Sequence, residues 1–394
     1  MTSPPDAPGR SVLLVEDGSG VTALAAARSL AAAGWRVIVG TPGGRSIATV
    51  SRSCHSSGVV RPVGSSTPQE WLGDVQRLAE RSGAVVVVPC GDAELVLLSA
   101  HRESLPELVV PYPEDVLVQQ VLDKYQVTEL ARSAGLRSPL TEIAVVGQPP
   151  SFDGRIVVKP RAHGPVRGPG RIEAVVVDSG AAALRRADEV RTAGVEAVYQ
   201  QHVKGWLVAH VVVRSKAGVV LARAHQRASR VFPQPAGNCV RGSIEPSPPG
   251  LADAVDRMLK ERGWWGLLQL EFLADAEGRL YLVDANPRPY GTLALAVGAG
   301  LPLCDLWLRD ALGDVVEPLG PPRSRSYQAL GLDLRRAAEQ RNPSMIRDLT
   351  TTVAAGRGAV RPVWSAGDPR PSLRLAKSVT RRIPGRLRRG VTGR

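Results

Sequence analysis

Residues 266–288 read GLLQLEFLADAEGRLYLVDANPR, and this stretch carries the most informative pattern in the chain. Two apolar segments flank the turn residues DAEG at 275–278, which predicts an antiparallel β-hairpin. Glu271 lies on the first predicted strand, and Asp284 and Asn286 end the second. Because side chains alternate along a strand, Asp284 and Asn286 share a face, and strand pairing brings Glu271 beside them.

Three oxygen-bearing side chains at one place predict a site for a hard cation. Mg²⁺ prefers oxygen ligands and takes one or two carboxylates together with substrate phosphates, and Mn²⁺ accepts the same ligand types. Arg288, two residues after Asn286, is then suited to neutralise a transferring phosphoryl group. The alternative is a surface hairpin with scattered acidic residues, and the hairpin alone does not decide between the two.

Segments upstream of the hairpin supply the cations that such a site needs. Lys159 ends the predicted apolar strand 155–160 (RIVVKP), where an ammonium costs free energy unless an anion meets it. The glycine- and proline-rich loop 161–171 follows, and its backbone N–H groups are suited to close over phosphates. Lys124 lies after Asp123 in a segment of helical period, 115–135. Only six of the 50 basic residues are lysine, so a lysine within a motif indicates a chemical requirement.

The order of these segments resembles that of the ATP-grasp superfamily. The matching pieces are DK (123–124), the strand ending in KP (157–160), the glycine-rich loop (164–170), QQHVKG (200–205), LEF (270–272) and DANPR (284–288). The chain is most similar to the carboxylate–amine ligases of that superfamily, of the D-aspartate ligase type, over residues 11 to about 312. The segment WSAGDPRPSL at 364–373 also resembles the end of that branch.

The resemblance implies roles for individual residues. The expected nucleotide contacts are made by two phosphate-binding lysines, by the glycine-rich loop and by a hinge that meets adenine: Lys124, Lys159, His163, Gly164, Gly168, Gly170, Gln200, Gln201 and Val203. The expected metal ligands are Glu271, Asp284 and Asn286. Three arginines are expected near the acyl phosphate or the substrate: Arg288, Arg227 and Arg230.

Three positions depart from the pattern of the superfamily. Gln201 stands where glutamate is common, and Trp206 and Leu207 replace an acidic residue that often holds the ribose. Both departures bear on the nucleotide contacts. Asp284 is shorter than the usual glutamate, which bears on the geometry of the metal site.

The resemblance implies a mixed α/β (α+β) fold built from a Rossmann-like parallel-sheet domain, a two-lobed ATP-grasp fold and a basic C-terminal appendage. The strand–helix–strand pattern of residues 11–40 independently predicts a parallel sheet. The expected boundaries are 10–112 for the N-terminal domain, 113–312 for the ATP-grasp domain with a small lobe at about 153–205, 313–327 for a linker, and 328–394 for a partly disordered basic region. The implied activity is ATP-dependent joining of a small carboxylate to a small amine through an acyl phosphate, with ADP and phosphate as products.

Charge and composition limit the expected partners and the expected location of the protein. Residues 323–394 hold 17 Arg or Lys and 4 Asp or Glu, which accounts for the whole net charge of +13. The balanced body argues against a nucleic-acid partner, whereas the basic tail is suited to an anionic membrane surface or an acidic polymer. A polar start, no apolar run of membrane-spanning length and four cysteines without a CxxC pair predict a cytoplasmic protein, peripheral to membranes at most, without zinc or disulfides.

The sequence leaves several alternatives open. One is an ATP-binding regulatory module without ligase chemistry. Another is a nucleotide-dependent oxidoreductase that uses the N-terminal strand–helix–strand unit, although DGSGVT at 17–22 is not GxGxxG. The identity of the carboxylate, the identity of the amine and the oligomeric state are not indicated by any motif.

Overall fold

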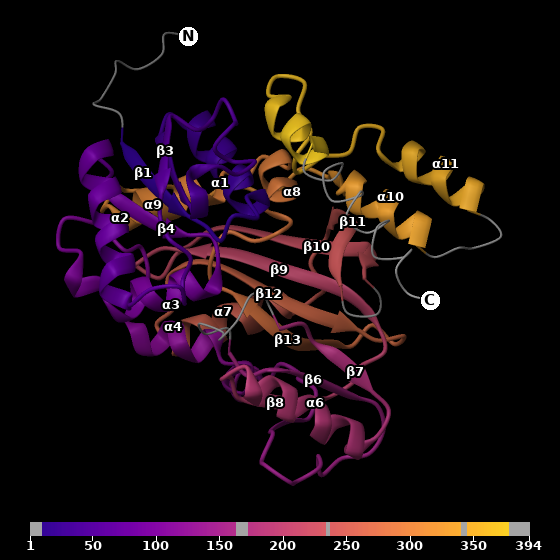
Figure 1. The fold of residues 1–394 in the computed structure, drawn as a ribbon. Coiled ribbons are helices and arrows are strands. Elements are labelled where there is room, and N and C mark those ends of the chain that lie inside the picture. The colour runs from indigo at the N-terminus through magenta and orange to yellow at the C-terminus, as the bar shows by residue number, and fades with distance from the viewer. Residues whose placement is uncertain (1–9, 163–171, 234–236, 340–344, 378–394) are drawn as a thin grey trace, which may run out of the picture.

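The computed structural model describes residues 10–162, 172–233, 237–339 and 345–377, and within these ranges the chain forms three β-sheets with helices packed on their faces (Figure 1). One sheet is parallel and the other two are mainly or wholly antiparallel. The predicted mixed α/β fold is confirmed.

The N-terminal sheet has the strand order β3-β2-β1-β4, and all its pairs are parallel. β1, β2 and β4 are short, buried apolar runs, whereas the edge strand β3 (SSGV) is mostly exposed. The first helix begins after Gly20, and the second begins with a capping box in which Thr67 and Glu70 bond each other's backbone N–H groups. The elements are β1 (Ser11–Val15), α1 (Val21–Ala32), β2 (Arg36–Thr41), η1 (Pro42–Gly44), β3 (Ser56–Val59), α2 (Pro68–Ser82), β4 (Val86–Pro89), α3 (Asp92–Ala100) and η2 (Arg102–Ser104).

The predicted helix 115–135 is two helices in the structure, because Asp123 ends the first and caps the second. Its carboxylate accepts hydrogen bonds from the backbone N–H groups of Tyr125 and Gln126, which stabilises a helix start. The helices are α4 (Asp115–Leu122) and α5 (Lys124–Ser133). Lys124 thereby becomes the first residue of a helix.

A four-stranded antiparallel sheet of order β5-β8-β6-β7 forms a small lobe, seen at the bottom of Figure 1. One face packs on a helix through Ile156, Val158 and Tyr199. The elements are β5 (Thr141–Ile143), β6 (Ile156–Pro160), β7 (Val175–Val177), α6 (Gly180–Thr192) and β8 (Ala197–Gln201). Alternation along β6 turns Lys159 away from that helix.

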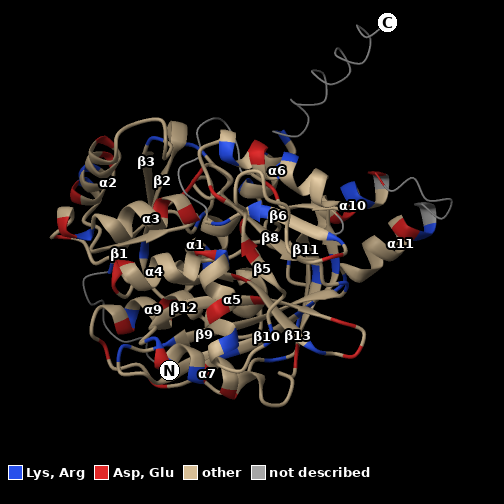
Figure 2. Cartoon of the chain, turned by 90° about the horizontal axis from the view of Figure 1, so that it is seen from below, with Lys and Arg blue, Asp and Glu red and all other residues tan. Residues whose placement is uncertain are grey.

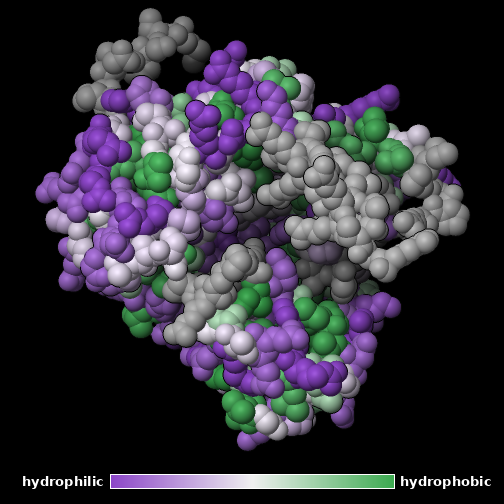
Figure 3. All heavy atoms as spheres, viewed as in Figure 1, coloured by the Kyte–Doolittle hydropathy of each residue, from purple (hydrophilic) through white to green (hydrophobic). Residues whose placement is uncertain are grey.

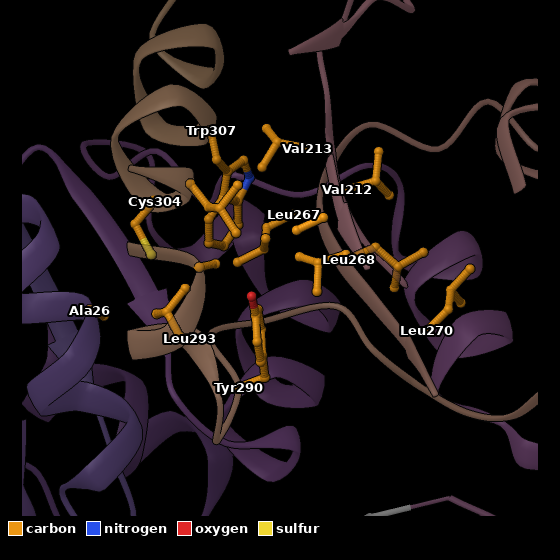
Figure 4. Close-up of a cluster of buried hydrophobic side chains, with 14 of the residues drawn as sticks. Ala26, Val212, Val213, Leu267, Leu268, Leu270, Tyr290, Leu293, Cys304 and Trp307 are labelled. Atoms are coloured by element: carbon orange, nitrogen blue, oxygen red, sulfur yellow. The ribbon is translucent and has the colours of Figure 1, made fainter. Parts of the chain in front are cut away.

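A six-stranded sheet of order β13-β12-β9-β10-β11-β14 forms the centre of the molecule. Its strands are β9 (Trp206–Arg214), β10 (Val220–Phe232), β11 (Asn238–Glu245), β12 (Gly266–Ala274), β13 (Leu280–Asn286) and β14 (Ser326–Gln328), and its helices are α7 (Leu251–Glu261), α8 (Leu293–Gly298) and α9 (Leu303–Ala311). Trp307 and Leu293 pack on Leu267 and reach toward Ala26 of α1 (Figure 4). One continuous core therefore joins the N-terminal domain to the central sheet.

The C-terminal region is more integrated than the sequence predicts. The segment 313–327 was expected as a linker, but it ends in β14 and is held by backbone hydrogen bonds from Leu319 to Leu221 (2.7 Å) and from Arg323 to Ala299 (2.9 Å). The basic appendage expected at 328–394 continues as α10 (Leu330–Glu339) and α11 (Met345–Ala355), which pack beside β11. The pairing of β14 with β11 is non-local, so local composition carried no sign of it.

A strap after α11 returns to the N-terminal domain. The carboxylate of Asp368 accepts hydrogen bonds from Ser51 Oγ (2.6 Å), the Arg52 backbone N–H (3.1 Å) and Arg28 Nη2 (3.0 Å). The part of the basic tail at 378–394 lies outside the described residues. Of the helices that the structure describes, none combines the length and the apolar character needed to cross a membrane.

Candidate functional site

The hairpin of β12 and β13 brings Glu271 beside the end of the second strand, as the sequence predicts. Glu271 lies directly opposite Asp284, and Gln269 lies opposite Asn286. An irregularity in the pairing follows between Glu271 and Phe272. Directly opposed side chains lie on the same face of a sheet, so the two carboxylates are neighbours.

Two buried lysines from other elements reach this end of the hairpin. Lys159 Nζ donates to the backbone carbonyl of Val283 at 2.8 Å, and Lys124 Nζ lies 3.5 Å from Asp284 Oδ1. Lys124, Lys159, Glu271 and Asp284 are called the charged cluster below. The structure thus brings together residues that are up to 160 positions apart in the sequence.

The electrostatics of Lys159 confirm that these groups surround one place. Only 7% of the residue is exposed, and this burial lowers its pKa to about 8. The carboxylates of Asp284 and Glu271 raise the pKa, whereas the ammonium of Lys124 lowers it further. Burial disfavours the charged form of an amine, so an additional anion at this point would stabilise the ammonium.

The hinge residues divide between the two faces of the small lobe. Gln200 is paired with Val157 and lies on the same face as Lys159, and its Nε2 donates to Thr141 Oγ1 at 3.0 Å. Alternation turns Gln201 to the opposite face. Val203 lies in the connection between β8 and β9, where the chain passes from one antiparallel sheet to the other.

The start of the glycine-rich loop is anchored beside the cluster. Arg161 Nε donates to Asp123 Oδ2 at 2.8 Å, and the Lys124 backbone N–H donates to the Arg161 carbonyl, also at 2.8 Å. These contacts tie the end of β6 to the beginning of α5. The four loop positions named from the sequence lie outside the described residues: His163, Gly164, Gly168 and Gly170.

Arg288 is buried and makes an ion pair with the N-terminal domain that the sequence did not predict. Its Nε donates to Asp92 Oδ1 at 2.5 Å, and its Nη2 donates to Asn286 Oδ1 at 3.2 Å. Asp92 and burial act on the pKa of Arg288 in opposite directions, and the net result is a rise. Asp92 was visible only as an acidic residue in the first turn of a helix, because no local signal links positions 196 residues apart.

A row of amide and hydroxyl side chains extends from this arginine across the central sheet. Asn286 Nδ2 donates to Gln269 Oε1 at 3.1 Å, Gln269 Nε2 donates to Thr292 Oγ1 at 3.4 Å, and Thr292 Oγ1 donates to Gln226 Oε1 at 2.7 Å. Gln226, Gln269 and Thr292 were missed in the sequence, because neutral polar residues in strands and turns form no recognisable motif. Together they form an uncharged, hydrogen-bonded row on the central sheet beside Asn286.

Arg227 and Arg230 are not brought to the charged cluster. Gln226 stands in the same row of the sheet as Glu271, so alternation turns the adjacent Arg227 to the other face. There Arg227 lies over the ring of Trp206 at 5.1 Å. Arg230 is engaged by C-terminal carboxylates, with Asp348 at 2.9 Å.

The donor set suits a cation that also binds a phosphorylated ligand. No group of three His, Cys, Asp or Glu side chains able to hold a metal occurs within the described ranges. The cluster offers two carboxylates, and the amide oxygen of Asn286 accepts from Arg288. Mg²⁺ commonly takes one or two carboxylates and completes its shell with phosphate oxygens and water, so the residues present fit it.

Solved structures with a similar fold were found by comparison. The biotin carboxylase domain of 2-oxoglutarate carboxylase from Hydrogenobacter thermophilus aligns with a TM-score of 0.58 and 17% identity over 77% of this chain and 71% of its own. The L-amino acid ligase of Bacillus licheniformis aligns with a TM-score of 0.59 and 13% identity, over 79% and 76% of the two chains. N5-carboxyaminoimidazole synthetase from Staphylococcus aureus aligns with a TM-score of 0.58 and 14% identity, over 84% of this chain and 86% of its own.

The chain has the ATP-grasp fold. At such identities the likeness concerns the fold, and the finer resemblance to the D-aspartate ligase type stays a prediction. No protein-family model matches the sequence, and neither does any curated protein.

Proposed function

We propose that the chain is an ATP-dependent carboxylate–amine ligase that activates a small carboxylate as an acyl phosphate and joins it to a small amine. The observation that carries the proposal is the charged cluster, in which buried Lys124 and Lys159 meet Glu271 and Asp284. Such a cluster of fixed opposite charges, reached from two sheets, suits a triphosphate and its metal ion. The named solved structures, a carboxylase domain, a ligase and a synthetase, support the reaction class.

In this proposal the two lysines bind phosphate oxygens of ATP. Glu271 and Asp284 would hold Mg²⁺, and the amide oxygen of Asn286 would be a further ligand. The bound metal ion neutralises the charge of the phosphates. The adenine lies against the hinge formed by Gln200, Gln201 and Val203.

The chain's own groups act mainly by positioning and by compensating charge. An oxygen of the substrate carboxylate attacks the γ-phosphorus, and ADP leaves. Arg288 stabilises the negative charge of the acyl phosphate from the N-terminal side. The amine then attacks the acyl carbon, the carbon–oxygen bond to phosphate breaks, and phosphate leaves. Arg227 and Arg230 have no part, since their side chains are engaged elsewhere.

The proposal is tested by ADP formation on a panel of small carboxylates and amines with Mg²⁺. Stimulation by one carboxylate–amine pair is expected, and Glu271→Gln should abolish it. Glu277→Gln is the matched control, because Glu277 lies in the turn of the same hairpin with an exposed side chain. Failure to bind MgATP in calorimetry would contradict the proposal, and MgATP uptake without substrate-dependent turnover would indicate a regulatory module instead.

The setting of the reaction is a separate part of the proposal. We place the enzyme in the cytoplasm, with the basic tail able to contact an anionic membrane or an acidic polymer. Flotation with anionic liposomes compares the intact chain with a chain that ends at Lys377. Equal failure to bind would remove the membrane contact and leave the ligase proposal unaffected.

A further inference from the structure

A second group of charged residues lies in the N-terminal domain, at the carboxyl ends of β1 and β4. The chain passes from β1 to β2 and β3 on one side and places β4 on the other, so the strand order reverses between β1 and β4. Ligands of open α/β sheets bind at this kind of switch point. Four carboxylates line it, and they are called the acidic crevice below: Glu16, Asp17, Asp92 and Glu94.

The crevice adjoins the ATP site through one ion pair. Asp92 is held by Arg288 at 2.5 Å, and Arg288 also contacts Asn286 at the end of β13. A molecule in the crevice would therefore lie next to the group that is proposed to hold the acyl phosphate. Figure 3 shows a hydrophilic hollow between the N-terminal domain and the small lobe.

The carboxylates of the crevice repel one another in a buried setting. Glu94 is 5% exposed and Glu16 is 4% exposed. The pKa of Glu94 is raised to about 7, mainly by burial; Asp17 and Asp92 contribute to the rise, whereas a backbone hydrogen bond and Arg288 oppose it. Burial is also the main cause of a raised pKa at Glu16, where Asp17 adds to the rise and the hydroxyls of Ser46 and Thr41 oppose it.

Helix capping explains only part of this charge. Asp92 and Glu94 lie in the first turn of α3, where negative charge is favourable. Glu16 and Asp17 belong to no helix. Arg288 is the cation that faces the group, and it is already paired with Asp92. A buried excess of negative charge costs free energy unless a cation meets it.

An independent observation points to a ligand at the same place. Tyr112 is 2% exposed, and its hydroxyl has no hydrogen-bond partner among the described residues. Both carboxylate oxygens of Glu16, a residue that is 4% exposed, likewise lack a hydrogen-bond partner among the described residues. Leaving a buried hydroxyl unpaired costs about 1–3 kcal/mol, and an N–H donor of a bound molecule would satisfy its oxygen.

Cys90 shows that these groups converge. It follows β4 and is fully buried, and burial is the main cause of its raised pKa. Glu16 and Glu94 raise the pKa of the same thiol, and Arg288 lowers it. The Cys90 backbone N–H donates to the Val15 carbonyl at 2.8 Å, so the ends of β4 and β1 are adjacent, and the Arg288–Asp92 ion pair joins α3 to the segment after β13. The entrance is polar, since Asp17 and Ser19 are exposed.

We propose that the acidic crevice binds the amine substrate of the ligase. This substrate carries a second, protonated amino group besides the amino group that attacks, as a short diamine or a basic amino acid does. The proposal rests on the proposed function for the role of this molecule as acceptor. Glu16, Asp17 and Glu94 hold the ammonium, Tyr112 accepts a hydrogen bond, and the second amino group is directed toward Arg288.

The test is calorimetric titration of the full chain, saturated with Mg²⁺ and a non-hydrolysable ATP analogue, with unbranched diamines of two to six carbons. The corresponding diols have the same length without charge. A diamine should bind and its diol should not. Glu94→Gln and Asp17→Asn should each weaken diamine binding about tenfold, as expected for the loss of a charge-assisted hydrogen bond.

Glu107→Gln is the matched control, because Glu107 is an exposed carboxylate near the opposite, amino end of β4, and it should bind the diamine as the unaltered chain does. The inference is overturned if no diamine binds, if the diol binds equally well, or if both crevice variants keep the affinity of the unaltered chain. A separate titration with the nucleotide analogue distinguishes the two proposals. Normal nucleotide uptake without diamine binding rejects the crevice alone, and absent nucleotide uptake rejects the ligase.

Discussion

Two buried groups of charges in this molecule are built differently. The charged cluster joins Lys124, Lys159, Glu271 and Asp284. Lys124 Nζ lies 3.5 Å from Asp284 Oδ1 in this cluster. The C-terminal ion-pair cluster joins β10 and β11 to α10 and α11, and its members are Arg230, Arg241, Arg336, Asp333 and Asp348. Figure 2 shows acidic and basic residues side by side over much of the body of the molecule, so charge alone does not mark a site.

The difference lies in how completely the charges are compensated. Asp333 is 0% exposed, and it accepts from Arg336 at 3.1 Å, from Gln328 at 2.9 Å and from Arg241. In the charged cluster, by contrast, Lys159 donates to a neutral carbonyl and its pKa is lowered to about 8. A saturated cluster stabilises the fold, whereas an incompletely compensated one has room for an anionic ligand.

The largest expected effect comes from removing a member of the charged cluster. Lys159→Ala should reduce ADP formation by about 10²–10³-fold or more, because a fixed charge that stabilises the transferring phosphoryl group is lost. Thermal unfolding should show an unchanged or higher midpoint, since a poorly compensated buried charge has been removed. Lys216→Ala is the matched lysine control, because Lys216 lies in the turn between β9 and β10 and donates to the Ala311 carbonyl. If Lys159→Ala formed ADP as fast as the unaltered chain, the proposed role of the cluster in binding ATP would be contradicted.

The reverse outcome is expected in the C-terminal cluster. Asp333→Asn should lower the free energy of unfolding by about 3–5 kcal/mol, because it leaves buried guanidinium groups uncompensated. Nucleotide affinity per folded molecule should stay the same. Glu339→Gln breaks an exposed ion pair with Arg335 and should cost about 0.5 kcal/mol or less. Chemical denaturation measures both, and equal effects of the two variants would show that the network is not structural.

An intermediate effect is expected at Asp92, which joins the two domains through Arg288. Asp92→Asn should lower kcat about 10–100-fold while the KM for ATP stays within about twofold, because Asp92 positions a side chain that acts on the acyl phosphate. Asp115→Asn, in the first turn of α4, controls for loss of a helix-start charge. A change in the KM for ATP with unaltered kcat would assign Asp92 a different role.

The smallest expected effect is a dependence of nucleotide affinity on pH. The pKa of Lys159 is about 8 in the folded chain, so affinity for MgATP should fall about tenfold as the pH rises from 7 to 9.5 and the ammonium loses its proton. The stability contribution has the opposite sign: between about pH 8 and 10.5 the unfolded chain binds more protons, so stability rises with pH. Lys159→Arg should remove both trends, and calorimetry at several pH values would detect their persistence.

The sequence alone predicts a large part of this molecule. Alternation places Asp284 and Asn286 on one face beside Glu271, and the structure has the two carboxylates opposite each other after an irregularity in the pairing. The parallel N-terminal sheet follows from apolar strands alternating with helices. These features are local, because hydrogen bonding and side-chain alternation within a few residues decide them.

Features that depend on contacts between distant segments were not predictable. Lys124 is adjacent to Asp284 only because α5 packs on β13, and Arg288 meets Asp92 only because the N-terminal domain docks on the central sheet. The same holds for β14, whose short sequence reads as linker until β11 supplies its partner.

Sequence patterns therefore supplied the candidate side chains, since the strand period and the residue types are properties of short segments. The packing of the three sheets decided which of those side chains meet. It brought the two lysines and the two carboxylates together, turned Arg227 to the other face and engaged Arg230 in a structural network. The physical reason is that burial and ion pairing are set by the whole fold, so the same arginine is a candidate for catalysis in one environment and a structural residue in another.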